Sequence, residues 1–342
     1  MTADLSAEVT GWLVRVFGAK SITDATQITG GVNNRIFRCM GDKGRAFVLK
    51  VFPQPAAAAR LRFRAEHEFL TYANEVAPGL VPGLIAADES QFAIVMEAID
   101  GAPFGENAVP RDDEIEVASA FLSRLNTDMK VAEHMLSSRA ADGFMTLSAH
   151  ANDVTQRIAT MTVEHIAQKF EAEGQTLVAH VRRVWDQTRS ALSNGIKSGA
   201  FEDELPAGAA CVSPSDFGFH NALRTARGLK FLDFEFAGWD DPAKCLGDLF
   251  LQPRIPVAAH FLQSFELALA ARMPLAALRR RHEALRPVLA VKWLTIILAV
   301  LRPDRLNDML VVRGDSAVDS LISERFKLAR ARLKQLENHG LH

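Results

Sequence analysis

Cysteine is scarce in this chain of 342 residues, which has only three: Cys39, Cys211 and Cys245. Their number is odd, and their spacing fits no metal-ligand motif. We therefore expect three free thiols in a reducing cytoplasm rather than a disulfide framework.

Long hydrophobic runs are also missing. The longest, from Pro287 to Leu301, has 15 residues and contains Lys292. A membrane-spanning helix needs about 20 apolar residues, so this run predicts a buried helix and no membrane partner. The first residues, Met1 to Glu8, are polar and acidic and lack the pattern of a signal peptide.

A strong excess of charge of one sign is absent as well. The chain has 39 Lys/Arg and 41 Asp/Glu, a net charge of -2, which gives no reason to expect a nucleic-acid partner. The charge is uneven, because residues 251–342 hold 15 basic and 8 acidic residues, a net of +7. With 48% hydrophobic residues, the composition is typical of a soluble globular protein, and the length suffices for two domains.

The order of apolar runs and turns predicts a small β-rich region followed by a larger helical one. Short apolar runs and glycine turns dominate the first hundred residues, whereas good helix formers dominate from about Asp112. We therefore expect an α+β fold with two lobes, a small antiparallel β-rich lobe at 1–98 and a mainly helical lobe at 99–342. The front elements expected are a helix at 6–17 capped by Ser6, a strand after the glycine turn at 30–34, a strand at 46–52, a helix at 56–75 and a strand at 91–99.

The front region contains a glycine-rich turn and, further on, a strand lysine. The turn Gly30-Gly31-Val32-Asn33-Asn34 would let backbone N–H groups approach a phosphate, although an ordinary hairpin turn has the same composition. Lys50 follows three apolar strand residues, and its burial there is costly unless it meets an anion. Glu66 on the next helix is the preferred carboxylate partner, and Glu68 is the second candidate. The alternative is an edge-strand lysine that reaches solvent.

The most informative stretch reads S-P-S-D-F-G-F-H-N-A-L and, after a turn, K-F-L-D-F-E-F. Asn221 follows Asp216 by five positions, and Asp233 closes an apolar strand 17 positions after Asp216. Phosphoryl transfer needs one carboxylate to orient a hydroxyl, and an amide and a second carboxylate to hold Mg²⁺. Each residue alone is also compatible with a turn cap or a loop amide. An extended segment would place Asp233 and Glu235 on opposite faces, and we expect Asp233 to face the metal.

Three other features are expected to be structural. His220 fits a substrate contact or a loop-orienting hydrogen bond, but packing is the simpler expectation. The basic run from Arg279 to His282 predicts a solvated helix face. Trp293 and its aliphatic neighbours are expected in the core.

Taken together, these residues resemble the aminoglycoside phosphotransferase and choline kinase-like family, small-molecule relatives of the protein kinases. The similarity runs in order from about Ile28 to Phe250. It implies a protein kinase-like two-lobe fold, with Lys50 as the phosphate-binding lysine and Glu66 as its ion-pair partner. In this comparison the nucleotide loop contains Gly30, Gly31, Asn33 and Asn34.

The same resemblance assigns the remaining site residues. The segment I-V-M-E-A-I-D-G resembles the hinge between lobes, with Met96 as gatekeeper and backbone groups of Glu97 and Ile99 receiving adenine. Asp216 corresponds to the catalytic aspartate. The Mg²⁺ ligands correspond to Asn221 and Asp233.

The chain departs from the family pattern at three places. Pro214 stands where the family usually has a histidine two positions before the aspartate, and Leu125-Asn126 replaces a frequent leucine-histidine pair. Asp248 comes six positions after Pro242, later than the family's usual aspartate. None of these changes removes a group that would contact phosphate or metal.

The resemblance implies a kinase that uses ATP and Mg²⁺, with GTP not distinguished, and transfers phosphate to a hydroxyl of a small molecule. We expect a sugar or amino alcohol, with an aminoglycoside-like acceptor as an alternative, because the basic C-terminal region disfavours polycations. We also expect a cytoplasmic monomer or homodimer. A nucleotide-binding pseudokinase or scaffold is the alternative that Pro214 motivates. A protein kinase is disfavoured because D-D-P follows Asp233 with little room for an activation loop.

Overall fold

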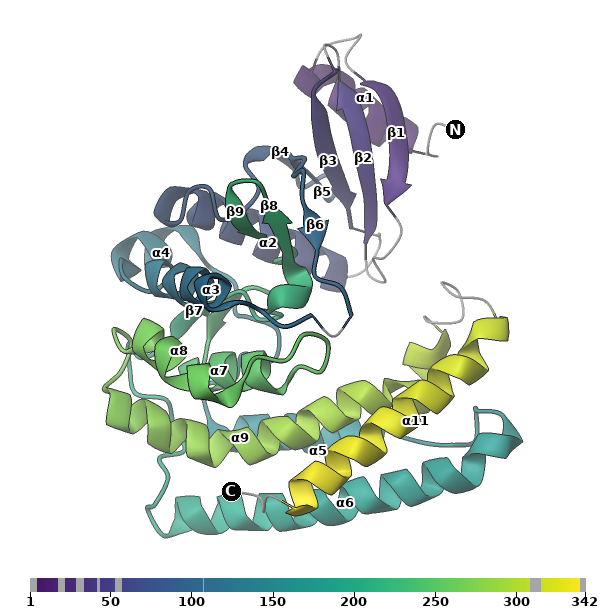
Figure 1. Ribbon diagram of the computed structural model, residues 1–342, viewed down its shortest axis with the longest axis vertical. Helices are drawn as coiled ribbons and strands as arrows, with labels where there is room; N and C mark the ends of the chain where they lie inside the picture. The colour runs from purple at the N-terminus through teal and green to yellow at the C-terminus, as the bar shows by residue number, and fades with distance from the viewer. Residues whose placement is uncertain are drawn as a thin grey trace. The chain divides into compact units, whose positions relative to one another are not determined.

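The computed structural model describes residues 5–17, 22–28, 34–41, 44–52, 57–106, 108–307 and 315–338. The chain forms two compact units (Figure 1). Unit 1 comprises Met1–Gly143, Cys211–Asp240 and Pro253–Ala271, and unit 2 comprises Phe144–Ala210, Asp241–Gln252 and Arg272–His342. The expected division into nucleotide-binding and catalytic lobes at residue 98 stays a prediction, because compact units do not show which residues bind nucleotide or acceptor.

Unit 1 contains a five-stranded antiparallel sheet in the order β1-β2-β3-β5-β4. On one face, Phe37 and Leu49 are buried with Trp12 and Leu13 of helix α1 (Ala7–Phe17), whose first turn is capped by the Ser6 hydroxyl. The strands are β1 (Ile22–Ile28), β2 (Arg35–Gly41), β3 (Ala46–Val51), β4 (Leu84–Asp88) and β5 (Ala93–Glu97).

The opposite face of this sheet carries the strand lysine. Lys50 pairs with Ile94 and Val48 pairs with Met96 in the β3–β5 register. Since side chains alternate along a strand, Lys50 points away from the face that buries Leu49. Helix α2 (Ala57–Val76) packs against β4 and β5 and brings its own buried side chains to Lys50.

The remainder of unit 1 surrounds the segment 211–240. Strands β6 (Ala102–Pro103), β8 (Ala222–Thr225) and β9 (Gly228–Phe231) form an antiparallel sheet that Figure 1 shows in the order β6-β8-β9. A second small sheet pairs β7 (Cys211–Ser213) with β10 (Gly238–Asp240). The helices are α3 (Asp112–Arg124), α4 (Met129–Met135), α8 (Leu262–Leu269) and the short 3₁₀ turns η2 (Phe219–Asn221) and η3 (Ala259–Phe261).

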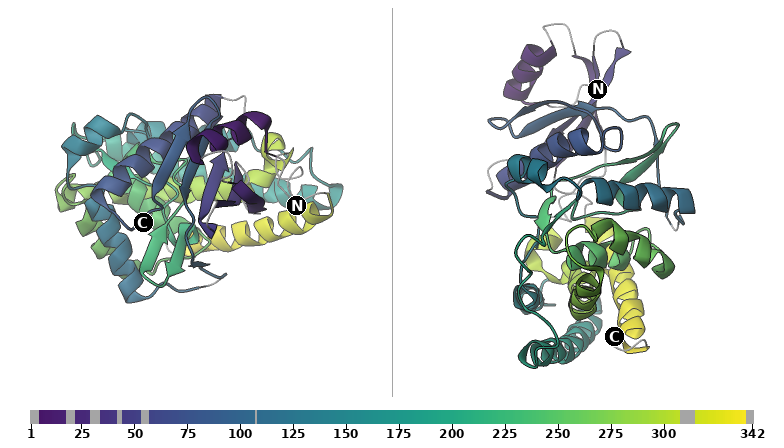
Figure 2. Two further views of the ribbon diagram at one scale, coloured as in Figure 1. Left: turned by 90° about the horizontal axis from the view of Figure 1, so that it is seen from above. Right: turned by 90° about the vertical axis from the view of Figure 1, so that its left-hand side faces the viewer.

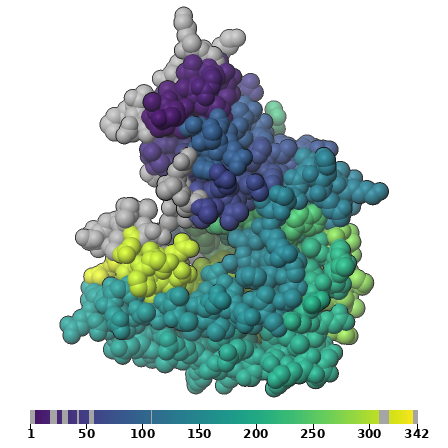
Figure 3. Space-filling model, turned by 180° about the vertical axis from the view of Figure 1, so that it is seen from behind, coloured from purple at the N-terminus to yellow at the C-terminus, as the bar shows by residue number. Residues whose placement is uncertain are grey.

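Unit 2 is helical. Helix α9 (Leu275–Ile297), continued by η4 (Leu298–Leu301), packs against each of the other long helices of this unit (Figure 2). Helix α6 lies along the lower edge of the face in Figure 3, coloured teal. The other helices are α5 (Leu147–Ala159), α6 (Gln168–Lys197), α7 (Pro242–Leu251) and α11 (Asp315–Asn338).

The longest apolar run, Pro287 to Leu301, forms the second half of α9 together with η4 and is largely buried. By length and composition alone, Leu275–Leu301 is the one described helix that could cross a membrane, but 72% of its most apolar window is buried within the protein. Packing against other helices accounts for this apolar surface. Trp293, expected in the core, is half-buried and donates its indole N–H to Asp248 at 2.9 Å.

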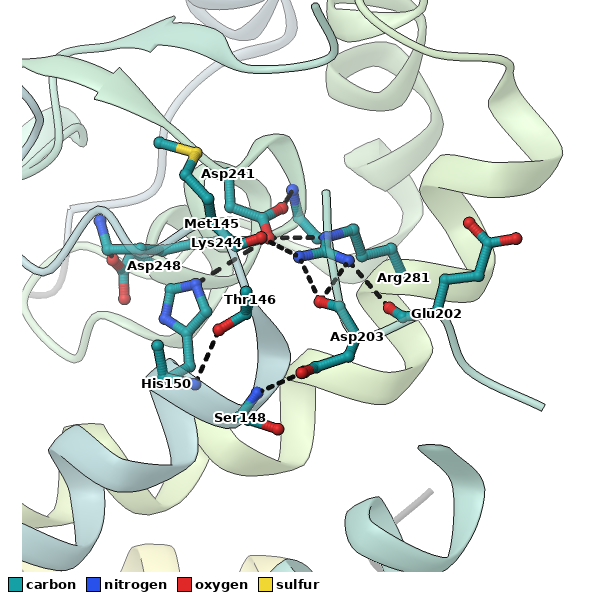
Figure 4. Close-up of polar contacts among 12 residues, drawn as sticks. Met145, Thr146, Ser148, His150, Glu202, Asp203, Asp241, Lys244, Asp248 and Arg281 are labelled. Carbon is teal, nitrogen blue, oxygen red and sulfur yellow. Dashed lines mark hydrogen bonds and ion pairs between the residues drawn. The ribbon is translucent and has the colours of Figure 1, made fainter. Parts of the chain in front are cut away.

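The basic run in α9 corrects one expectation. Arg281 and His282 are only 6% and 7% exposed, so the prediction of a solvated helix face was wrong for these two residues. The Arg281 guanidinium donates to the Asp241 carboxylate at 2.7 Å and to backbone carbonyls of Glu202 and Met145 (Figure 4). A run of three arginines and a histidine gave no sign of this burial, because sequence periodicity does not reveal a buried counter-ion.

Candidate active site

Lys50 lies between two carboxylates in unit 1. Its side chain is 3% exposed, and its Nζ contacts Glu66 and lies 2.6 Å from Asp233 Oδ1. Burial lowers the pKa of Lys50, but the carboxylates of Glu66, Asp233 and Glu235 outweigh it and raise the pKa above its ordinary value. The ammonium therefore stays charged, with an excess of negative charge around it.

The structure distinguishes between the two candidate carboxylates of α2. Glu66 is buried and reaches Lys50. Glu68 instead accepts hydrogen bonds from the backbone N–H groups of Ser137 and Ser138, at 2.9 and 3.1 Å. Residues two positions apart on a helix are separated by about 200° of rotation, so they point to nearly opposite sides and only one of the pair can face the sheet. Glu68 thus fixes the start of the 137–143 segment, and Glu66 takes the position expected of the ion-pair partner.

Asp233 and Glu235 do not alternate as in a strand. Strand β9 ends at Phe231, and Asp233 has a left-handed backbone with φ of 66°. The prediction of an extended segment was therefore wrong here. Asp233 contacts Lys50, and Glu235 also raises the pKa of Lys50 and accepts a hydrogen bond from the Asn34 side chain. Both carboxylates lie near the lysine because this turn brings them to the same side.

Asp216 sits on a tight loop after β7. Ser215 has a left-handed φ of 65°, and its N–H donates to the buried Ser213 hydroxyl at 3.0 Å. The Asn221 side-chain amide donates to the Asp216 backbone oxygen at 3.0 Å and to its Oδ2 at 3.2 Å. The ring of His220 contacts Asp216 Oδ1 at 3.1 Å. The 40% exposed carboxylate of Asp216 is thus held from its own loop while open to solvent.

The oxygens left over at this site fit Mg²⁺. Because the Asn221 nitrogen is engaged with Asp216, its Oδ1 points elsewhere and has no hydrogen-bond partner among the described residues. Asp233 uses Oδ1 for Lys50 and is 43% exposed. Mg²⁺ typically takes one or two protein oxygens and completes its shell with phosphate and water. Within the described ranges no three His, Cys, Asp or Glu side chains gather as a metal cluster.

The other expected nucleotide contacts are described only in part. Gly30, Gly31 and Asn33 lie outside the described residues. Asn34 is half-buried, and its Oδ1 has no partner in the part of the chain that the structure describes.

The expected hinge residues follow from β5. Met96 is buried on this strand, and Glu97, whose N–H donates to the Gly83 carbonyl at 2.8 Å, ends it. Ile99 is half-buried two residues later. The contacts of Glu97 and Ile99 with adenine stay a prediction.

Sequence reasoning missed the residue that fixes β7. Asn126 is fully buried and bonds both backbone groups of Val212: Oδ1 accepts from its N–H at 2.8 Å, and Nδ2 donates to its carbonyl at 3.0 Å. The amide thereby acts as a further peptide group beside the strand that leads to Asp216. The Leu125-Asn126 departure was the available signal, but nothing in the sequence indicated its partner 86 positions away.

The chain matches the phosphotransferase enzyme family, abbreviated APH, over residues 24–285. The chain belongs to this family. The resemblance read from the motifs is thereby confirmed, and the protein is a small-molecule phosphotransferase that acts on hydroxyl groups. A comparison with curated proteins found no match.

Solved structures of small-molecule kinases resemble the chain over nearly its whole length. A choline/ethanolamine kinase family protein from Mesorhizobium loti is 19% identical, with a TM-score of 0.57, covering 95% of this chain and 94% of that one. A spectinomycin phosphotransferase in complex with ADP and spectinomycin is 12% identical, with a TM-score of 0.58 and coverage of 96% and 99%. The streptomycin–ATP complex of APH(2")-IIa is 14% identical, with a TM-score of 0.54 and coverage of 95% and 99%. These matches confirm the expected protein kinase-like fold.

Proposed function

We propose that this phosphotransferase moves the γ-phosphate of ATP to a hydroxyl of a sugar or amino alcohol. The observation that carries the proposal is the buried Lys50, held by Glu66 and Asp233. These carboxylates already offset the cost of burying the ammonium. A lysine held by a helix glutamate beside a partly exposed aspartate is the arrangement with which kinases bind nucleotide phosphates, and this supports the proposal. ATP and ADP in the complexes of two structural neighbours support the nucleotide.

Each side chain has a role in this reaction. Lys50 would hold the α- and β-phosphates, with Glu66 fixing its direction. Asn221 and Asp233 would supply oxygens to Mg²⁺, which offsets the negative charge of the transferred phosphoryl group. Asp216 would orient the acceptor hydroxyl and accept its proton as the new O–P bond forms and the bond to ADP breaks.

Nucleotide binding is tested by calorimetric titration of ATP and GTP, with and without Mg²⁺. We expect Mg²⁺-dependent binding that Asp233→Asn weakens at least about tenfold, because a metal ligand is lost. Glu66→Gln should weaken binding as well, whereas Glu68→Gln, two positions along the same helix, is the matched control. Equal loss in both α2 variants would refute the assigned pairing.

Phosphotransfer is tested by ADP release in the presence of choline, ethanolamine, monosaccharides, spectinomycin and streptomycin. We expect turnover with at least one acceptor and a loss of about 10³-fold or more in Asp216→Asn, with nucleotide binding retained. Turnover with the two antibiotics alone would overturn the preference for a sugar or amino alcohol. Nucleotide binding without any turnover across wider acceptor panels would favour the scaffold alternative, which no observation on this chain supports.

A further inference from the structure

Both carboxylate oxygens of Asp216 are in hydrogen-bond contact with residues at the end of its own loop. His220 Nε2 lies 3.1 Å from Oδ1, and the Asn221 amide lies 3.2 Å from Oδ2. One contact alone would leave the carboxylate free to rotate about its Cβ–Cγ bond, whereas two contacts on different oxygens fix its plane. Asn221 already has a proposed role as a metal ligand. The contact from His220 has no such role and requires an explanation of its own.

The environment of the His220 ring determines which way its hydrogen bond runs. The side chain is only 5% exposed, while Asp216 is 40% exposed. Nδ1 of His220 is buried without a hydrogen-bond partner in the described part of the chain. Nδ1 therefore lacks a partner in either tautomer and does not decide where the hydrogen lies. The partner of Nε2 is a carboxylate oxygen, which only accepts hydrogen bonds, so the 3.1 Å contact requires a hydrogen on Nε2. The ring thus donates to Asp216.

The backbone explains why the support comes from this side. Residues 219–221 form the 3₁₀ turn η2, and Phe219 anchors it by packing its buried ring 5.2 Å from that of Phe104. This turn folds the His220 ring back over the aspartate four positions earlier. On the other side, Pro214 has no side-chain donor, and its carbonyl accepts the Asp216 N–H at 3.0 Å. The histidine that contacts the Asp216 side chain therefore stands at position 220.

We propose that His220 is a positioning residue for Asp216: its Nε2–H holds Oδ1 so that the carboxylate faces the acceptor hydroxyl. Its role rests on the phosphotransfer proposed above for the same site. The ring need not touch substrate, nucleotide or metal. The carboxylate retains further lone pairs for the hydroxyl, since each oxygen can accept more than one hydrogen bond. In this chain, therefore, the histidine after the aspartate orients the carboxylate.

Two substitutions separate orientation from packing. His220→Met fills the buried space without a donor, whereas His220→Gln keeps an N–H at nearly the same reach. We expect His220→Met to lower kcat by about 10- to 100-fold, because small misplacements of a reacting group cost that much. The KM for ATP should stay within about threefold, since no nucleotide contact is lost, and His220→Gln should recover to within about fivefold of wild type. His134→Gln, at an exposed position of α4, is the control for histidine replacement.

The assay uses Mg·ATP with the acceptor that gives the highest turnover in the panel, and water as acceptor in a parallel measurement of ATP hydrolysis. A His220→Met variant with wild-type kcat would overturn the positioning role. So would a His220→Gln variant no better than His220→Met. A rise in the KM for ATP together with a fall in kcat, accompanied by loss of folded protein, would indicate packing and equally overturn the proposal.

NMR of ¹⁵N-histidine-labelled protein tests the contact without turnover. Among the ten histidines, the signal lost in His220→Gln should show a hydrogen on Nε2. Asp216→Ala should shift that signal, because the acceptor of the hydrogen bond is gone. A ring without a hydrogen on Nε2, or a signal indifferent to Asp216→Ala, would refute the contact. If the wild-type chain turned over no acceptor at all, the proposed function would fail, and the NMR result would still determine whether the hydrogen bond exists.

Discussion

Replacing the buried Asn126 is the perturbation whose cost can be worked out most directly from the structure. Its amide makes three hydrogen bonds, to the N–H and carbonyl of Val212 and to the Leu122 carbonyl at 2.9 Å. Asn126→Leu keeps the volume but leaves these backbone groups without that partner in a site closed to water. Each stranded group costs about 1–3 kcal/mol.

The expected net loss is smaller than the sum of these costs. The leucine contributes apolar burial worth about 1.5–3 kcal/mol, which offsets part of the penalty. We therefore expect Asn126→Leu to lower the free energy of unfolding by about 3 kcal/mol, a large part of the total of about 5–15 kcal/mol for a typical domain. The site should suffer too, because Val212 lies on the strand that leads into the Asp216 loop.

Urea denaturation and hydrogen exchange measure this effect at two scales. The exchange rate of the Val212 amide should rise by about two orders of magnitude if its hydrogen bond is lost, since about 1.4 kcal/mol corresponds to a factor of ten. Asn74→Leu is the matched control. Asn74 also donates to two carbonyls, of Leu70 and Pro82, but it is only half-buried, so water can replace it. A loss below about 1 kcal/mol in Asn126→Leu, equal to that in the control, would refute the reasoning.

Three further predictions concern unit 2. Burial, followed by neighbouring lysine cations, lowers the pKa of His150 to about 3 from 6.5. As the pH falls through about 6.5, His150 therefore becomes protonated in the unfolded chain but stays neutral in the folded chain. The stability due to this group is full above that pH and falls by about 1.4 kcal/mol between pH 7.5 and 5.5. Urea titrations at both pH values should show a smaller fall in His150→Gln, and identical falls would contradict the shift. Gly247→Ala should cost about 1–3 kcal/mol, because its new methyl group would collide with the Leu289 side chain of α9. Adding Leu289→Ala should cost less than the sum of the single changes, whereas strict additivity would exclude the collision. Arg281→Met should cost about 3–5 kcal/mol by leaving Asp241 buried without its cation. Asp241→Asn added to Arg281→Met should then restore part of the melting temperature, and no recovery would rule out a charge effect.

The front of the active site could be predicted because its signals are local. Lys50 follows apolar strand residues, and the strand period alone places it on the face opposite Leu49. The interval from Asp216 to Asn221 lies within one loop, where spacing translates directly into proximity. Strand and helix boundaries in this region agree with the expected ones to within a few residues, as for β3 at Ala46–Val51 and α2 at Ala57–Val76.

The rest depended on contacts between distant segments. The sequence could order Glu66 before Glu68 only by preference, and the rotation of α2 against the sheet determined which one meets Lys50. The positions of Asp233 and Glu235 depend on the left-handed backbone of Asp233, which the sequence does not signal because no glycine stands there. The choice of Asn126 as partner for Val212 depends on where the end of α3 meets β7.

By itself, then, the sequence determined the family and the kinase-like fold and singled out the candidate site residues, because periodicity and short intervals encode elements and loops. The tertiary structure decided which charges are buried and which atoms they face. Burial of Arg281 and the donor direction of His220 follow from the groups packed around them from elsewhere in the chain. The linear sequence does not show which groups will pack around a residue, although these groups determine the free energy of a buried charge or hydrogen bond.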